Sequence, residues 1–224
     1  MTNDYYKLIK KLRLERGLSQ ADIAEKVRIG RTTYINFEQG KTELTLSVAS
    51  KLAELLGLSL QEIETGEVPN YEKYREMILA FLRLSKKVTK TKLAKLLYFA
   101  DFSWFYYNLK SMSGMQYRKM SYGPVSDAYF RIIDDMSERG EINIDQTKDG
   151  AMLISETRGG AKAKLSSLNK EEEKLIGDIE NKWKNKKTSE IVNFTHNQFP
   201  YLYSKDNEIV SYALFTQEDP DEIF

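Results

Sequence analysis

The chain has 224 residues, of which 41% are hydrophobic and 30% are charged, and its formal net charge is +1. This length suits one or two domains with a buried core, and no apolar run approaches the roughly 18 residues of a membrane span. The absence of cysteine excludes disulfides and thiolate zinc sites. Because the N-terminus also lacks the shape of a signal peptide, we expect a cytoplasmic protein.

Short amphipathic segments dominate the first 64 residues. Apolar residues at spacings of three or four, between capping residues and glycines, predict helices over residues 4–16, 20–27, 31–39 and 45–56, followed by a fifth, short turn over 60–64. Ser19 is a good N-cap for the second of these helices, with Asp22 as the acid three residues later. Thr45 or Ser47 opens the fourth helix, and Gly57 ends it.

The helix over 31–39 is the predicted DNA-reading element. Its inner pair, Tyr34 and Phe37, locks it to the rest of the domain, whereas its start faces outward. Arginine and asparagine form paired hydrogen bonds with base edges in the major groove, and helix N-termini favour phosphates. We therefore predict base contacts from Arg31, Thr32, Thr33 and Asn36. The predicted phosphate contacts are Gln20 and Lys41.

Several blocks in residues 7–64 resemble the helix-turn-helix domain of the Cro/C1 (Xre-like) repressor family. The blocks are Lys11-Leu12-Arg13, Gly17-Leu18-Ser19-Gln20, Ile23-Ala24, Glu38-Gln39-Gly40-Lys41 and residues 52–59. The resemblance implies a five-helix DNA-binding domain. It also implies that Glu38 is structural, that Gln20 contacts phosphate, and that the base readers are Arg31, Thr32 and Asn36.

The chain departs from the pattern of this family at four positions. Arg28 stands where the family often has glycine, and Gly30 replaces a serine or threonine cap. Leu44 replaces a common proline, and Ile35 is apolar on the outward side of its helix. These departures weaken DNA binding more than they weaken the fold. The alternative is therefore a helix-turn-helix kept only for dimerisation or protein docking.

A break over residues 65–70, with glycine and proline three residues apart, separates two predicted domains. We expect a helix-turn-helix domain over 1–66, a linker over 67–72 and a second domain over 73–224. Helical spacing in the second domain predicts helices over residues 71–84, 91–109, 125–139, 169–187 and a shorter one from 188. Tyr122-Gly123-Pro124-Val125 is predicted to be a rigid turn. Two β-favouring segments, 141–145 and 151–156, predict a wing-like hairpin, so the fold class is mainly α with a small β-hairpin.

The second domain is similar to the Panacea domain, also called SocA-like. The matching blocks are residues 92–101, Tyr122-Gly123-Pro124-Val125 and Thr195-His196-Asn197. The resemblance implies the antitoxin of a toxin–antitoxin operon, which binds and neutralises a cognate protein toxin encoded next to it; some members deliver the toxin to a protease. The N-terminal domain then binds operator DNA, as a homodimer or in complex with the toxin, and represses the operon.

Aromatic residues are concentrated in the helix over 91–109, for which central packing and a partly exposed protein-binding face are both open interpretations. The candidate toxin contacts are Tyr98, Phe102, Phe105, Tyr106 and Tyr122. Residues 83–119 carry nine Lys or Arg and one Asp, and residues 206–224 carry six acids and no base. The acidic segment either meets a basic toxin or folds back on the basic stretch.

Catalysis is the alternative from a different class of function. The chain has one histidine, His196, and no Gly-rich phosphate loop, and its adjacent carboxylates diverge around helices. We therefore expect no catalytic residues, no metal site, no cofactor and no membrane partner, and we interpret His196 as a hydrogen-bonded structural residue. The remaining alternative is a stand-alone, phage-type repressor whose second domain senses a ligand or a protein.

Overall fold

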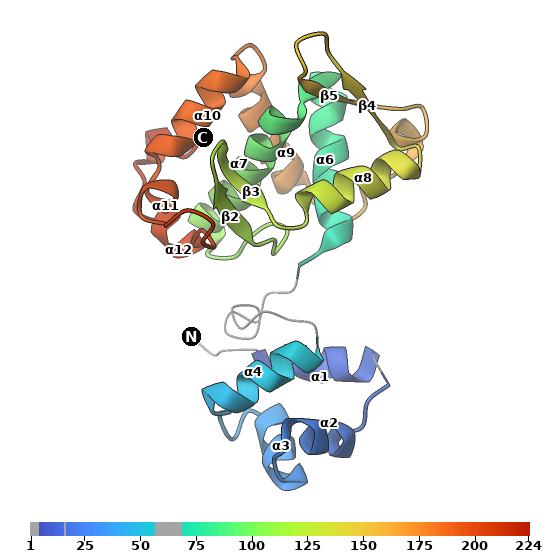
Figure 1. Cartoon of the computed structure of the whole chain (residues 1–224), viewed down its shortest axis with the longest axis vertical. Helices are drawn as coiled ribbons and strands as arrows, with labels where there is room; N and C mark the ends of the chain where they lie inside the picture. Colours follow the sequence, from blue (N-terminus) through green and yellow to red (C-terminus); the bar gives the residue numbers. More distant parts are fainter. Residues whose placement is uncertain (1–4, 16, 57–68) are drawn as a thin grey trace. The chain divides into compact units, whose positions relative to one another are not determined.

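The computed structural model describes residues 5–15, 17–56 and 69–224, and the chain divides into two compact units, Met1–Val68 and Pro69–Phe224 (Figure 1). Each unit has a hydrophobic core of its own. The predicted turn over 60–64, the predicted helix end at Gly57 and residues 67–68 of the expected linker lie outside the described residues.

The described part of the first unit contains α1 (Tyr5–Glu15), α2 (Gln20–Val27), α3 (Arg31–Glu38) and α4 (Leu46–Leu55). The predicted start of α2 is confirmed, because Ser19 Oγ accepts the Asp22 N–H at 3.1 Å and the Ser19 N–H donates to the Asp22 carboxylate at 2.8 Å. This reciprocal pair satisfies two backbone donors at the helix start. The four helices share a core that includes Ile9, Ile23, Val27, Tyr34, Phe37 and Leu52.

The second unit is mostly helical. Its elements are α6 (Tyr71–Ser85), β1 (Lys87–Thr89), α7 (Lys90–Asn108), β2 (Tyr117–Met120), β3 (Gly123–Ser126), α8 (Tyr129–Glu138), β4 (Ile142–Gln146), β5 (Met152–Glu156), α9 (Lys170–Trp183), α10 (Thr188–Asn197), α11 (Phe199–Leu202) and α12 (Tyr212–Phe215). Helix α7 lies at the centre and contacts α6, α9, α10 and α12 (Figure 1). Its residues 92–103 are all buried, so central packing is the arrangement observed. Among the residues that the structure describes, no helix has the length and apolar character needed to cross a membrane.

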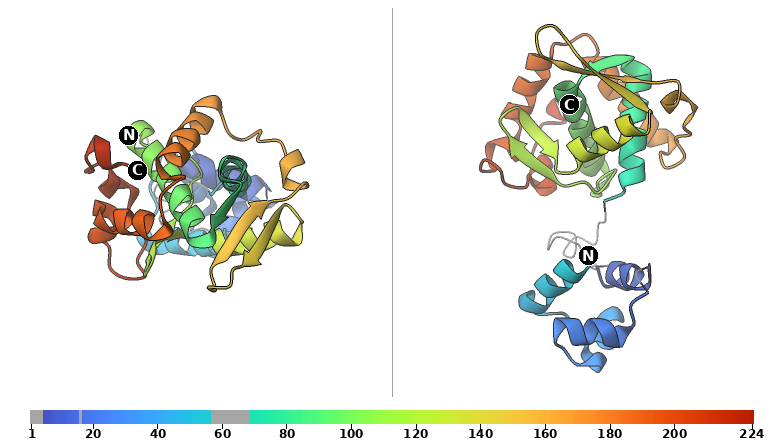
Figure 2. Two further views of the ribbon diagram at one scale, coloured as in Figure 1. Left: turned by 90° about the horizontal axis from the view of Figure 1, so that it is seen from above. Right: turned by 45° about the vertical axis from the view of Figure 1, so that its right-hand side comes forward.

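Within the described residues, the strands form two antiparallel sheets, with the orders β1-β5-β4 and β2-β3. Strands β4 and β5 are the predicted hairpin, and β1 adds to it by placing Val88 opposite Ile154. Figure 2 shows this sheet at an edge of the second unit, where β4 contacts α8. The sequence analysis did not predict β1, which is three residues long and pairs with a strand far along the chain.

The prediction of a rigid turn at residues 122–125 was wrong except at Tyr122, which lies in the short turn between β2 and β3. Gly123–Ser126 is strand β3, in which Pro124 pairs with Lys119 of β2. Proline is tolerated there because each strand of a two-stranded sheet is an edge strand. Helix α8 accordingly begins at Tyr129 rather than at 125, and α9 ends at Trp183 rather than at 187.

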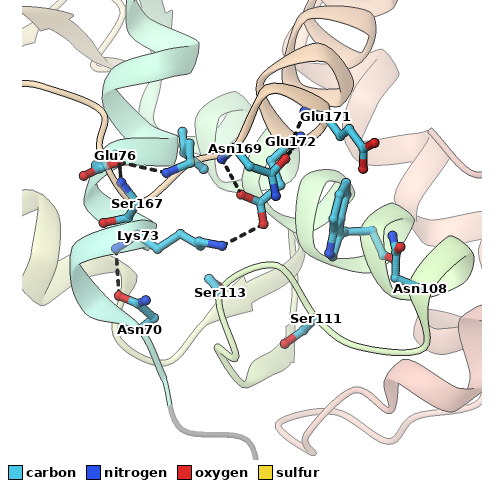
Figure 3. A network of polar contacts seen from close by, with 12 residues as sticks. Asn70, Lys73, Glu76, Asn108, Ser111, Ser113, Ser167, Asn169, Glu171 and Glu172 are labelled. Carbon is cyan, nitrogen blue, oxygen red and sulfur yellow. Dashed lines mark hydrogen bonds and ion pairs between the residues drawn. The ribbon is translucent and has the colours of Figure 1, made fainter.

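Buried carboxylates tie α6 to the segment that enters α9 (Figure 3). Glu76 on α6 is 2% exposed, and it accepts the backbone N–H groups of residues 166–168 at 3.0, 2.7 and 3.2 Å. Lys73, one turn earlier, pairs with Glu172 at 2.7 Å, and Asn169 caps α9. The backbone hydrogen bonds to the Glu76 carboxylate compensate for its burial, and they fix the path of this loop.

The C-terminal segment folds back onto the basic stretch. The backbone N–H of Val210 donates to the Tyr117 carbonyl at 2.7 Å, and the Lys119 N–H donates to the Glu208 carbonyl at 2.9 Å. Lys119 Nζ also lies 3.8 Å from the Asp206 carboxylate. Of the two interpretations of the acidic segment, folding back is therefore the one observed.

Glu218 gives this attachment a pH dependence. Its carboxylate is 7% exposed and accepts the Phe199 N–H, and burial raises its pKa from 4.5 to about 6. As the pH rises through this interval, the unfolded chain loses the proton before the folded chain does, so the free energy of unfolding falls. We expect Glu218→Gln to remove that loss and to stabilise the unit by about 1–2 kcal/mol at pH 7.5, with little effect at pH 4.

Urea unfolding followed by tryptophan fluorescence at both pH values measures this difference, since both tryptophans, Trp104 and Trp183, lie in the second unit. Glu138→Gln changes an exposed carboxylate near the end of α8 and is the matched control. Equal destabilisation by Glu218→Gln at both pH values would contradict the raised pKa.

Candidate nucleic-acid interface and partner-binding region

Helix α3 has one buried face and one exposed face. Tyr34 and Phe37 are buried, and the Phe37 ring centroid lies 5.5 Å from that of Tyr5 on α1. Arg31, Thr32 and Thr33 are exposed on the first turn, and Asn36 is half-buried one turn later. The first turn of α3 therefore offers a guanidinium and two hydroxyl groups to solvent.

A buried ion pair links α1 to the end of α3. Arg13 Nε lies 2.6 Å from Glu38 Oε1, and Arg13 Nη2 lies 3.1 Å from Oε2. Gln20 Nε2, at the start of α2, donates to the same carboxylate at 2.9 Å. Burial opposes ionisation of Glu38, but the hydrogen bonds from Arg13 and Gln20 outweigh it and hold the pKa of this carboxyl below its ordinary value. Glu38 thus joins three helices, in keeping with its expected structural role.

The departures from the family pattern are accommodated by local geometry. Arg28 ends α2 in the left-handed conformation, with φ of 61°, at a cost of about 1–2 kcal/mol that glycine would not have. Gly30 precedes α3 without a side-chain cap, and Leu44 packs against the core. Ile35 is half-buried rather than fully outward, and Lys41 is exposed just beyond α3.

The five candidate partner contacts differ in their exposure. Tyr98 and Phe102 are fully buried, with ring centroids 4.3 Å apart, so the prediction that they contact a toxin was wrong. Their position on the central helix makes them core residues. Phe105 and Tyr106, near the end of α7, are half-buried, whereas Tyr122 is 71% exposed in the turn between β2 and β3.

Lys95 is a buried group that the sequence analysis did not single out. Its side chain is fully buried on α7, and Nζ donates to the Pro124 carbonyl at 2.6 Å. Burial lowers the pKa of Lys95 to about 7. Gly123 permits this close approach, since a Cβ there would lie 2.5 Å from Thr195 Oγ1 and 2.9 Å from Lys95 Cε. The signal in the sequence was a lysine within the otherwise apolar run 93–100.

His196 stacks on an aromatic ring near this lysine. Its ring centroid lies 4.2 Å from that of Tyr201, with the planes 9° apart. Burial, followed by the charges of Lys95 and Lys119, lowers the pKa of His196. The buried Nε2 atom has no hydrogen-bond partner among the described residues, so the expected hydrogen bonding through this atom is not observed.

Two families match this chain in separate regions. Residues 9–63 match the family described as helix-turn-helix, and residues 93–200 match the family described as antitoxin SocA-like, Panacea domain. Both families are of regulator or antitoxin types. No solved structure is significantly similar to the chain.

The curated relatives each match less than a third of the chain. The cryptic phage CTXphi transcriptional repressor RstR of Vibrio cholerae is 31% identical over 65 residues, which are 29% of this chain and 59% of that protein. The HTH-type transcriptional regulator YqaF of Bacillus subtilis is 39% identical over 51 residues, covering 23% of this chain and 67% of that protein. A regulator of the same type from Methanocaldococcus jannaschii is 34% identical over 55 residues, covering 25% of this chain and 83% of that protein.

The α1–α4 arrangement and the buried Arg13–Glu38 pair define a helix-turn-helix domain. The chain belongs to the family of helix-turn-helix regulators. Its second unit carries an antitoxin SocA-like, Panacea domain.

Proposed function

We propose that this protein is the antitoxin of a toxin–antitoxin operon. The observation that carries the proposal is the union of a helix-turn-helix domain and a SocA-like Panacea domain in one chain. The first unit binds operator DNA and represses the operon. The second unit binds the protein toxin encoded next to it and neutralises that toxin by direct contact.

DNA binding is assigned to α3 and the start of α2. The base contacts are Arg31, Thr32, Thr33 and Asn36, and the phosphate contacts are Gln20 and Lys41. One N–H of the Gln20 side-chain amide donates to the Glu38 carboxylate, and the second N–H is assigned to a phosphate oxygen. A homodimer of the first unit would place two such helices in half-sites about 34 Å apart.

Replacing Arg31 by alanine should weaken operator binding by about 1–3 kcal/mol and relax specificity at one base position, because a guanidinium makes two bonds to guanine. Gln20→Ala should weaken binding to all DNA sequences more evenly. Gel-shift titration with the DNA upstream of the gene, at fixed salt, measures both effects. Arg158→Ala removes an exposed arginine of the second unit and is the control. Unchanged affinity of Arg31→Ala would show that α3 does not read the operator.

Neutralisation is tested by expressing the adjacent gene alone and together with this chain. We expect growth arrest from the adjacent gene alone and recovery when the full chain is present. Recovery should persist in Arg31→Ala, because neutralisation belongs to the second unit. The antitoxin function would be contradicted if the adjacent gene is harmless when expressed alone, or if its product stays toxic when this protein is present.

A stand-alone, phage-type repressor is the second candidate function. The observation that favours it is the similarity of the first unit to a phage transcriptional repressor. In that case the second unit senses a ligand or a protein. This alternative would be supported if the chain represses its own operon and that operon encodes no toxic partner.

A further inference from the structure

A groove crosses the second unit between the start of α7, the β2–β3 turn, α8 and the start of β5. Its main cavity has a volume of about 590 Å³. A second hollow of about 480 Å³ shares Thr91, Ser121, Tyr122 and Thr188 with it and extends to His196 on α10. Together these hollows are large enough to receive several side chains of a partner.

Exposed apolar side chains from separate segments surround the main cavity. Tyr122 is 71% exposed and Phe130 is 50% exposed, and Met120 and Met152 are 42% and 38% exposed. They come from the β2–β3 turn, α8, the end of β2 and the start of β5. Exposed apolar side chains gathered in one place mark interaction surfaces, since their burial on association is favourable.

The charge of the groove has one sign. Among the described residues that line the two hollows, the charged ones are Lys90 and Lys95, and none is an aspartate or glutamate. Lys90 Nζ lies 3.7 Å from Asp134, whose side chain is 64% exposed, and 5.2 Å from the centre of the Phe130 ring. Because the Asp134 side chain is mostly exposed and the contact is long, the pair is weak, so a carboxylate of a partner can replace Asp134.

Lys95 adds a basic group beneath the cavity. Within the described residues its one hydrogen bond goes to the Pro124 carbonyl, although an ammonium group has three donors. A nearby anion stabilises the charged form of a buried amine that has few acceptors, so Lys95 favours the binding of an anionic group in the cavity. The groove therefore combines an apolar rim with a basic floor and edge.

We infer that this groove is the toxin-binding surface, and that it receives a toxin segment that carries an apolar side chain next to a carboxylate. The apolar side chain packs among Tyr122, Phe130, Met120 and Met152, and the carboxylate pairs with Lys90. This inference rests on the proposed antitoxin function, and it adds the site and the chemistry of the bound segment.

Matched serine substitutions in the full chain test the groove. Tyr122→Ser and Phe130→Ser remove groove residues, whereas Tyr107→Ser and Leu84→Ser remove side chains of similar exposure, 61% and 52%, outside it. Isothermal titration with the purified protein encoded by the adjacent gene is the measurement. We expect each groove variant to weaken binding at least about tenfold, and each control to change it by less than about threefold.

Lys90 tests the charge of the bound segment. Lys90→Glu should weaken binding by at least about tenfold, because it repels the carboxylate, whereas Lys90→Gln should have a smaller effect. Urea unfolding followed by the fluorescence of Trp104 and Trp183, which both lie in the second unit, should be unchanged in all of these variants and shows that this unit remains folded. Sedimentation of the chain alone should also be unchanged.

The outcomes separate the groove from the proposed function. If the unmodified chain binds and neutralises the adjacent protein and the groove variants do so equally well, the groove inference is wrong and the antitoxin function stands. If the unmodified chain does not bind that protein, both fall. If the groove variants alter self-association of the chain alone, the groove is an interface between copies of this chain, and the inference is overturned.

Discussion

Glu38→Ala is expected to cost the first unit about 3–5 kcal/mol of its free energy of unfolding. The substitution leaves the Arg13 guanidinium, 7% exposed as a residue, without its carboxylate partner inside the core. It also removes the acceptor that Gln20 uses at the start of α2. Because a domain of this size is only marginally stable, most of the helix in residues 5–56 should be lost.

The two tryptophans make this effect measurable within the intact chain. Trp104 and Trp183 both lie in the second unit, so the fluorescence transition should occur at the same urea concentration as in the parent. Circular dichroism should show a loss of helix at a lower urea concentration. Glu25→Ala, at an exposed position of α2, should shift neither the fluorescence transition nor the loss of helix. A single unfolding transition that moves for both signals would contradict independent folding of the two units.

Gly123→Ala is expected to destabilise the second unit by about 2–5 kcal/mol. Gly123 has φ of +89°, in the region that favours glycine, and its missing side chain leaves room for Lys95 and Thr195. An added Cβ would lie 2.5 Å from Thr195 Oγ1. Either α10 shifts away from β3, or the Lys95 side chain leaves its position against Pro124.

Gly140→Ala separates backbone strain from the steric clash. Gly140 has φ of +69°, but a Cβ there meets no atom within 4 Å, so its cost should be only about 1–2 kcal/mol. Urea unfolding followed by tryptophan fluorescence compares the two variants. Equal costs would mean that the close packing of Lys95 and Thr195 against β3 contributes nothing beyond the conformation of Gly123.

Features set by short stretches of sequence were predicted well. Ser19 and Asp22 cap α2 as expected, because both partners of a capping box lie within one turn of each other. Thr89 similarly caps α7, which begins at Lys90, one residue before its expected start at residue 91. The β-favouring segments 141–145 and 151–156 placed the β4–β5 hairpin, since a short connection brings two such segments side by side.

Features that depend on distant partners were missed. The proline in residues 122–125 indicated a turn, but β3 forms because β2 and the Lys95 side chain lie beside it. Strand β1 exists because β5 accepts it as a neighbour. Strand pairing is stabilised by contacts between segments, which local propensity does not report.

The candidate partner contacts show the same limit. The aromatic content of α7 suggested a protein-binding face. Residue spacing alone could not show that Tyr98 and Phe102 belong to the core rather than to a contact surface. The groove is assembled from Tyr122, Phe130 and Met152, which lie in separate segments. For the first unit, by contrast, the exposed residues of α3 come from one helix, so their shared face was readable from the sequence.

The folded-back C-terminal segment also sets the order in which the chain can mature during synthesis. Val210, Phe215 and Ile223 are core residues, and Gln198 Nε2 donates to the carbonyls of residues 222 and 223. The described core of the first unit lies within residues 9–56, so this unit can fold while the ribosome is still translating the second. The core of the second unit includes Ile223, so this unit can complete its packing only after that residue has left the exit tunnel, when the first unit can already be folded.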